Sequence, residues 1–391
     1  MLRFLTLLGF VLLGLAACTQ TERTRSEVAE SINEDKAAAR EHMDTGNYDV
    51  AVEILRPHVG DRVRDPQVHK MLGECYWRLG DYAQATTSYE NALRIDYSNS
   101  DTHLSLGEML MEMGKIGRAL TELGLAVQFG ERAPLPYYNY GLALYRFGRV
   151  DDALAQWETA YQIDPANPDY SAALAMGYTG RDDVKALEHF ERAAAFGAAD
   201  VNFFNNYGLL LMKTGHLVRA GAQFNYALAI EPENESVTFN FATLEMRSGE
   251  YTRAAKRLEA LYRLDEIDHR YRVYLAKSYV ETRNYNGSVE LLEEWVEAQD
   301  PASKDLCAPG LDEAFSILAM SYRGLGDLSR AGNTMQRAIE LAPRNVIHLI
   351  NYGVMLAENG NIEAAKAQWE RALELEPENA LARQNLSATA Q

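Results

Sequence analysis

The sequence predicts an all-α solenoid of about ten helix–turn–helix repeats. One residue pattern returns every 34 residues over most of the chain. Small residues fill two fixed positions of the pattern, and a large apolar residue fills a third. Only 11 of the 391 residues are proline, so long helices are rarely interrupted. Because one short hairpin cannot bury its apolar face alone, neighbouring hairpins must stack.

The repeats are placed by aligning the chain on itself. Repeat starts fall at residues 32, 66, 100, 134, 168, 201, 235, 269, 312 and 346. One repeat is shortened after residue 168, and one insertion precedes residue 312. We therefore expect repeats 1–8 over residues 32–302, an irregular insertion over 303–311, and repeats 9 and 10 over 312–379.

Three positions of the repeat, which we call columns, show the 34-residue period. Position 8 is always small: Ala39, Gly73, Gly107, Gly141, Ala175, Gly208, Ala242, Ala276, Ala319 and Gly353. Position 20 is also small: Ala51, Ala85, Ala119, Ala153, Ala186, Ala220, Ala254, Ser288, Ala331 and Ala365. Position 24 is large and apolar: Leu55, Tyr89, Leu123, Trp157, Phe190, Phe224, Leu258, Leu292, Met335 and Trp369. Small residues let two helices approach closely, and the large ones fill the space beside them.

Glycine and proline mark the ends of the helices in the hairpins. Glycine follows the first helix of many repeats, where a left-handed residue is favoured: Gly46, Gly80, Gly114, Gly148, Gly215, Gly326 and Gly360. Proline ends four repeats and stops the second helix there: Pro165, Pro232, Pro343 and Pro377.

The pattern resembles the tetratricopeptide repeat, a helical hairpin of the same length. The clearest copies are Tyr137–Pro165, Phe204–Pro232 and Leu349–Pro377. The resemblance implies a right-handed superhelix with a concave inner surface that binds other proteins. Repeats 7 and 8 depart from the pattern, since Leu261 and Trp295 replace alanine.

The two ends lie outside the repeats. Residues 1–17 have a basic start and a short apolar run, as in a secretory signal peptide. Leu15-Ala16-Ala17-Cys18 resembles a bacterial lipobox, whose cysteine is acylated. Residues 18–31 read as a lipidated flexible tether, and 380–391 as a capping helix with Leu381 and Leu386 inside. Since residue 19 is Thr, not Asp, we expect the periplasmic face of the outer membrane.

Charge and composition narrow the partners. The net charge of −18 repels nucleic acid, so the expected partners are proteins, with the membrane reached through the lipid. Three cysteines are too few for a disulfide framework. No metal-ligand spacing, phosphate loop or nucleophile motif is present, so we expect no enzyme, cofactor, metal or small-molecule substrate. His69 and His103 are interpreted as packing residues.

A partner is expected along the first helices. By resemblance to the family, positions 2, 5, 6, 9, 12 and 13 face or flank the inner groove. Position 6 carries amides that can pair with an extended backbone: Asn139, Asn206, Asn240 and Asn351. Apolar side chains lie beside them: Tyr138, Tyr145, Leu209, Met212 and Phe239. Capping or ordinary packing between repeats is the alternative for both sets.

The expected function is a membrane-anchored periplasmic adaptor, with a place in assembling a pilus or secretion machine. The lipobox and repeats together resemble the lipoproteins of Flp-type pilus systems. The alternatives are an adaptor that recruits cell-wall hydrolases or synthases, and an enzyme built on the repeats.

Lipidation of Cys18 is directly testable. Replacing Cys18 with Ser removes the thiol that would be acylated, so acyl labelling should be lost. The protein should then leave the membrane fraction, because stable anchoring depends on acyl chains. Metabolic labelling with a palmitate analogue and fractionation measure both effects. Unchanged labelling would contradict the anchor.

Overall fold

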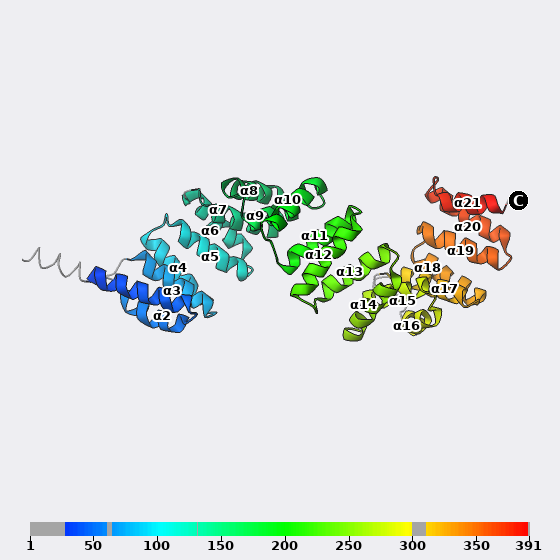
Figure 1. The fold of residues 1–391 in the computed structure, drawn as a ribbon, viewed down its shortest axis with the longest axis horizontal. Helices are drawn as coiled ribbons and strands as arrows, with labels where there is room; N and C mark the ends of the chain where they lie inside the picture. Colours follow the sequence, from blue (N-terminus) through cyan, green and yellow to red (C-terminus); the bar gives the residue numbers. More distant parts are fainter. Residues whose placement is uncertain (1–27, 61–64, 131, 299–309, 390–391) are drawn as a thin grey trace, which may run out of the picture. The chain divides into compact units, whose positions relative to one another are not determined.

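The computed structural model describes residues 28–60, 65–130, 132–298 and 310–389, and every regular element in these ranges is a helix (Figure 1). The expected signal peptide, Cys18, most of the tether and most of the insertion lie outside the described residues. Residues 28–31, assigned above to the tether, are helical and continue into a helix that ends at residue 44. The predicted all-α solenoid of stacked hairpins is confirmed.

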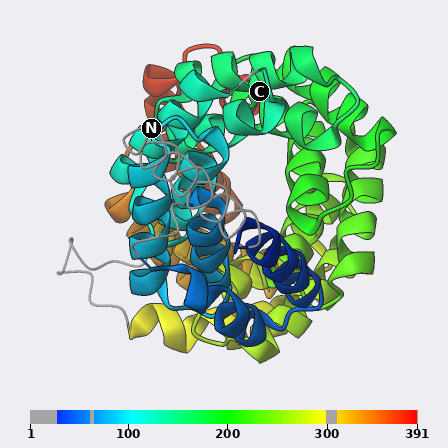
Figure 2. The ribbon, with the colours of Figure 1, turned by 90° about the vertical axis from the view of Figure 1, so that its left-hand side faces the viewer.

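Two compact units divide the chain, residues 1–198 and 199–391. The first unit opens with the helix over 28–44. Its further helices are α2 (Tyr48–Leu55), η1 (Arg56–His58), α3 (Pro66–Arg78), α4 (Tyr82–Ile95), α5 (Ser100–Glu112), α6 (Ile116–Phe129), α7 (Pro134–Arg146), α8 (Val150–Ile163), α9 (Pro168–Tyr178) and α10 (Asp183–Ala195). Within it, α3 packs on α4, α5 on α6 and α7 on α8, seen in blue to green in Figure 2.

The second unit repeats the same arrangement. Its helices are α11 (Val201–Lys213), α12 (Leu217–Ile230), α13 (Glu235–Arg247), α14 (Tyr251–Leu264), α15 (His269–Glu281), α16 (Tyr285–Glu297), α17 (Leu311–Gly324), α18 (Leu328–Leu341), α19 (Val346–Glu358), α20 (Ile362–Leu375) and α21 (Ala380–Ala388). Each odd-numbered helix from α11 to α19 packs on the helix that follows it.

Helix starts follow local chemistry. The first helix of most repeats begins just after an Asp or Asn whose side chain accepts a hydrogen bond from a backbone N–H of the first turn. These capping residues are Asp65, Asn99, Asn167, Asp200, Asn234, Asp268 and Asn345. The helices α3, α5, α7, α9, α11, α13, α15 and α19 begin at the residues where the period places repeat starts, and α17 begins one residue earlier.

The close approach inside each hairpin is made by positions 8 and 24. A Cβ placed on Gly73 would lie 2.8 Å from the Tyr89 ring, and one on Gly208 would lie 2.7 Å from Phe224. Such distances are far below van der Waals contact, so no side chain larger than that of glycine fits at these two positions. Position 20 is fully buried in nearly every repeat, including Ala153 and Ala220.

The turn inside each hairpin requires a left-handed residue. The glycines predicted there have positive φ, from 71° at Gly114 to 86° at Gly148. Repeat 8 has Arg283 at the same place, with φ of 61°. A non-glycine residue carries a conformational cost of about 1–2 kcal/mol in this region. Repeat 8 therefore departs from the pattern in its turn as well as in its helices.

Neighbouring repeats are joined by a recurring hydrogen bond that the column analysis missed. A tyrosine at position 11 donates to a glutamate at position 25 of the preceding repeat. The pairs are Tyr178 with Glu158 at 2.5 Å, Tyr279 with Glu259 at 2.8 Å and Tyr322 with Glu293 at 2.5 Å. Burial, with the Glu contact, raises the pKa of Tyr178 and Tyr279 to about 12. These phenols therefore stay protonated and remain donors.

The C-terminal cap differs from the prediction in one residue. Helix α21 forms as expected, and Leu386 packs against the core of the second unit. Leu381, expected inside, is 61% exposed, and Ala382 is the fully buried residue instead. The reason is helical phase, because adjacent residues point about 100° apart and Asn379 fixes where the helix begins.

Overpacking tests the hairpin contact. We expect Ala153→Leu or Ala220→Leu to destabilise the protein by about 1–3 kcal/mol, because no space is left around either residue. Hydrogen exchange should show the loss first in the mutated repeat and its neighbours. Val218→Leu is the matched control, since Val218 lies on α12 with Ala220 but is 91% exposed. Equal melting of the Ala220 and Val218 variants would contradict the assigned contact.

Candidate functional site

The predicted partner-binding residues divide between the two units. Tyr138, Asn139 and Tyr145 lie on α7 in the first unit. The second unit holds the others: Asn206, Leu209 and Met212 on α11, Phe239 and Asn240 on α13, and Asn351 on α19. That these residues form a partner-binding groove stays a prediction, and the contacts of each are described within its own unit.

Asn139 is joined to the preceding repeat. Its Nδ2 donates to Oε1 of Glu108 on α5 at 2.6 Å. Burial raises the pKa of the Glu108 carboxyl above its ordinary value of 4.5, and the Asn139 amide only partly counteracts this rise. The Asn139 side chain therefore uses one of its donors inside the protein, while its Oδ1 still offers an acceptor.

The amides of the second unit are used differently. Asn240 donates to Oδ1 of Asn205 on α11 at 2.9 Å, so it links repeats 6 and 7. Asn206 and Asn351 are half-buried, and their side chains make no hydrogen bond within the described ranges. These two amides are therefore the ones with unused hydrogen-bonding capacity.

The apolar residues of the set serve partly in packing. The Tyr138 ring lies 5.2 Å from Tyr170 in the next repeat. Phe239 lies 5.6 Å from the Tyr271 ring and 5.0 Å from that of Tyr274. These rings hold repeats together.

The remaining three are more accessible. Tyr145 is 38% exposed and leans on Trp157, with 5.5 Å between the rings. Leu209 and Met212 are half-buried on α11. Tyr138 and Phe239 therefore pack between repeats, whereas Tyr145, Leu209 and Met212 keep exposed area.

A cleft of about 480 Å³ lies along the first helices of repeats 8, 9 and 10, and we call it the α15–α19 cleft. Its lining residues are Lys277, Val280 and Glu281 of α15, Asp312, Glu313, Ser316, Ile317 and Met320 of α17, Ile347, His348 and Asn351 of α19, and Gly310 and Asn345 before these helices. Most stand at positions 2, 5, 6, 9, 12 or 13 of their repeats. Among the nine predicted residues, Asn351 lines this cleft.

The polar groups of the α15–α19 cleft converge from all three helices. Lys277 Nζ pairs with Oε1 of Glu313 at 2.7 Å. His348 is 4% exposed, and its Nε2 lies 3.0 Å from Asp312 Oδ2 and 3.0 Å from Asn345 Nδ2. Its Nδ1 is buried without a hydrogen bond in the described structure. A cleft of this size with a few convergent polar groups suits recognition.

A second cleft, of about 510 Å³, lies between α12, α13 and α14. Glu245 is 6% exposed there and accepts from Nε of Arg257 through both carboxylate oxygens, at 3.0 and 3.1 Å. The Arg257 guanidinium lies 4.0 Å from the centre of the Phe241 ring. Burial raises the pKa of Glu245, against the effect of Arg257. We interpret this pair as structural, since each charge already satisfies the other.

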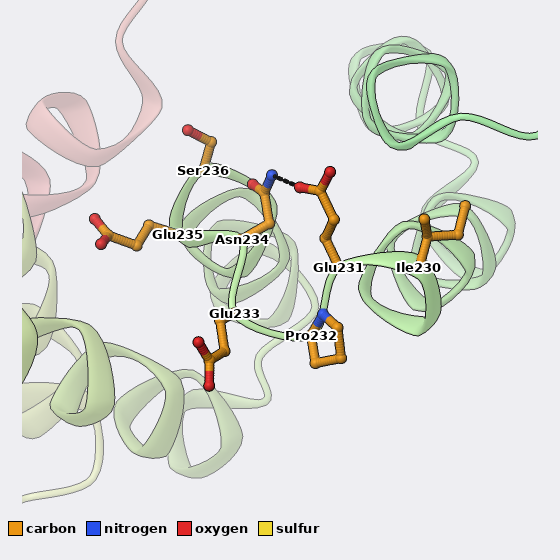
Figure 3. Close-up of a pocket in the computed structure, with 7 residues that line it drawn as sticks. All are labelled: Ile230, Glu231, Pro232, Glu233, Asn234, Glu235 and Ser236. Carbon is orange, nitrogen blue, oxygen red and sulfur yellow. Dashed lines mark hydrogen bonds between the residues drawn. The ribbon is translucent and has the colours of Figure 1, made fainter. Parts of the chain in front are cut away.

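A third hollow, of about 750 Å³, is lined only by the turn from Ile230 to Ser236 (Figure 3). Asn234 Nδ2 donates to Glu231 Oε2 at 2.8 Å. Figure 3 shows Glu233 and Glu235 pointing away from that pair. All seven lining residues come from one continuous segment, the end of α12, the turn and the start of α13, so this hollow lacks the convergence that specific recognition needs.

The described residues also bear on metal binding, membrane crossing and thiol chemistry. No group of three or more His, Cys, Asp and Glu there could hold a metal. Within the same ranges, no helix combines the length and apolarity that crossing a bilayer requires. Burial raises the pKa of the Cys75 thiol to about 12, so this cysteine is unreactive.

The two histidines pack, as interpreted from sequence. His103 is 1% exposed and lies 2.8 Å from Glu122 and 2.9 Å from the Tyr97 carbonyl. Burial lowers the pKa of His69.

Stacked helical hairpins with a cleft along their first helices are typical of repeat proteins that serve as scaffolds. The family model of the tetratricopeptide repeat matches residues 36–100, 71–136, 104–168, 239–304 and 318–380, together more than half of the chain. This chain therefore belongs to the tetratricopeptide repeat family, whose repeats bind protein partners.

The curated relatives are distant. BBSome complex member BBS4 of Bos taurus is 21% identical over 91% of this chain and 63% of its own length. Superkiller protein 3 of Schizosaccharomyces pombe is 23% identical over 76% of this chain and 23% of its own length. This chain thus spans less than two thirds of either relative.

Solved structures share the fold at low sequence identity. A structure titled as the functional characterization of Pseudomonas aeruginosa pilF is 19% identical, with a TM-score of 0.44. It covers 57% of this chain and 97% of its own.

Removing the half-buried Glu108 carboxylate should change the pH dependence of stability. A carboxyl whose pKa is raised by folding stabilises the protein below its ordinary pKa of 4.5, and this contribution is lost as the pH rises through the folded value. Glu108→Gln keeps an acceptor for Asn139 and removes the titration. Its stability relative to wild type should therefore increase as the pH rises above about 4.5.

Urea unfolding at several pH values from 4 to 8 measures this difference. The control is Glu188→Gln, which removes an exposed carboxylate from the same unit. If the Glu108 variant were relatively least stable at neutral pH, the buried-carboxylate account would be wrong.

Proposed function

We propose that this protein is a non-enzymatic adaptor that holds partner proteins along the first helices of its repeats, tethered to the cell envelope by a lipid on Cys18. The α15–α19 cleft is the observation that carries the proposal. It lies on the first helices, it is open to a ligand, and it contains an amide, Asn351, with unused hydrogen-bonding capacity. Membership of the tetratricopeptide repeat family supports the same role.

The proposed cellular role rests on the N-terminal sequence and on the repeats. The sequence Leu15-Ala16-Ala17-Cys18 supports a lipid anchor, and Thr19 favours the outer membrane, with the repeats in the periplasm. A lipobox followed by tetratricopeptide repeats resembles the assembly lipoproteins of pilus machines. We therefore propose that the partners are components of a pilus or secretion apparatus.

The direct test is photo-crosslinking in membranes of the native host. A photoreactive residue at Ile347, which is 66% exposed on the rim of the cleft, should capture a protein partner. Asn206→Ala with Asn351→Ala should reduce that capture about tenfold, because an unpaired polar group costs about 1–3 kcal/mol. This double variant should fold normally, since neither side-chain amide makes a hydrogen bond within the described ranges.

The matched control is a photoreactive residue at Leu381, which is 61% exposed on the cap and outside the cleft. Mass spectrometry identifies the captured protein. Capture at Ile347 of pilin, secretin or secretion-ATPase components supports the proposal. Capture that is equal from both positions, or unchanged in the amide variant, would rule out the first-helix surface.

A further inference from the structure

We propose that the α15–α19 cleft selects an extended protein segment that carries a lysine or arginine beside an apolar side chain. This inference rests on the proposed function, because it names the chemistry of the partner. It comes from the charges, the apolar surface and the hydrogen-bonding groups that line the cleft.

The charged side chains that line the cleft carry a net negative charge. Three carboxylates line it, Glu281, Asp312 and Glu313, against one cation, Lys277. Because Lys277 is paired with Glu313 at 2.7 Å, Glu281 and Asp312 are left without a Lys or Arg partner in the described structure. Glu281 is exposed, and the Asp312 side chain is 29% exposed. A guanidinium or ammonium group would complement both.

Apolar side chains line the same cleft. Ile347 is 66% exposed on α19, although large apolar side chains are usually buried. Met320 on α17 and Val280 on α15 are half-buried and line the same space. An apolar partner side chain placed there would cover Ile347, and methionine adapts readily to different ligand shapes.

The polar lining favours an extended backbone over a compact ligand. Asn351 offers both donors and an acceptor, and Ser316 adds a hydroxyl on the neighbouring helix. The cleft crosses α15, α17 and α19, so a ligand that fills its 480 Å³ touches three successive repeats. An acidic segment would meet uncompensated like charge from Glu281 and Asp312, which excludes it.

The test uses three short fluorescent peptides with identical apolar residues, carrying two arginines, two glutamines or two glutamates. Binding to the full chain, purified in detergent, is measured by fluorescence anisotropy. We expect the arginine peptide to bind at least tenfold more tightly than the glutamine peptide, and the glutamate peptide to bind worst. The preference should shrink with added salt, because the charges are partly exposed.

Two variants locate the site. Glu281→Gln with Asp312→Asn should weaken the arginine peptide about ten- to a hundredfold, while Asn keeps a polar side chain of the same shape beside His348. Glu370→Gln with Glu374→Gln removes the same charge from exposed positions on α20 and should bind like wild type. Ile347→Ser should weaken all three peptides. Equal binding of the three peptides, or equal loss in both charge variants, would overturn the inference.

The two proposals fail in different ways. The peptide experiment needs no cellular partner, so it tests the chemistry of the cleft directly. If crosslinking captures a partner at Ile347 but the peptides show no preference for arginine, the adaptor role stands and the basic segment is wrong. If the arginine peptide is selected but no partner is captured in membranes, the cleft chemistry stands and the adaptor role fails.

Discussion

The close contact between positions 8 and 24 is the constraint on which the rest of this structure depends. Where glycine faces an aromatic ring, as Gly73 faces Tyr89, the two helices of a hairpin approach so closely that no Cβ fits between them. This spacing fixes the angle and depth of each hairpin, and so decides which residues of the first helix remain available on its other side. The α15–α19 cleft is lined by such residues.

Hydrogen bonds between side chains help to join neighbouring repeats. Three Tyr–Glu hydrogen bonds join successive repeats, and Asn139 and Asn240 add two more across the first helices. Ser288, which replaces the usual alanine at position 20, accepts from Ser321 of the next repeat at 2.8 Å. Such bonds need exact register, whereas apolar contacts tolerate sliding. They specify how neighbours stack, while the apolar columns supply most of the stabilisation.

Much of the fold could be read from sequence, because every hairpin solves the same packing problem with the same residue types. Ten copies make a column visible where one copy would not. The phase of α21 was missed, since a terminal helix has no following repeat to define its buried face. The Tyr–Glu bonds were missed because they join columns of different repeats, although comparing position 11 with the preceding position 25 would reveal them.

The candidate site was harder to predict for a physical reason. Position 6 marks the residues that can face a groove, but whether an amide is available depends on what the neighbouring repeat presents to it. Asn139 is hydrogen-bonded to Glu108 and Asn240 to Asn205, whereas Asn351 lines the α15–α19 cleft. The cleft itself depends on Ile347, Met320 and Glu281 together, and these residues differ from repeat to repeat. A period describes what repeats share, while a binding site is made from what they do not share.

The buried tryptophans give the molecule its own spectroscopic reporters. Trp157 in the first unit and Trp369 in the second are almost fully buried, and each indole donates to a carbonyl nineteen residues earlier in the chain, Tyr138 and Ile350 respectively. Their fluorescence should respond to loosening of the hairpin that holds them. With Trp77 and Trp295 replaced by Phe, and then one of the two buried indoles as well, the emission of a single residue would follow one half of the chain, without any attached dye.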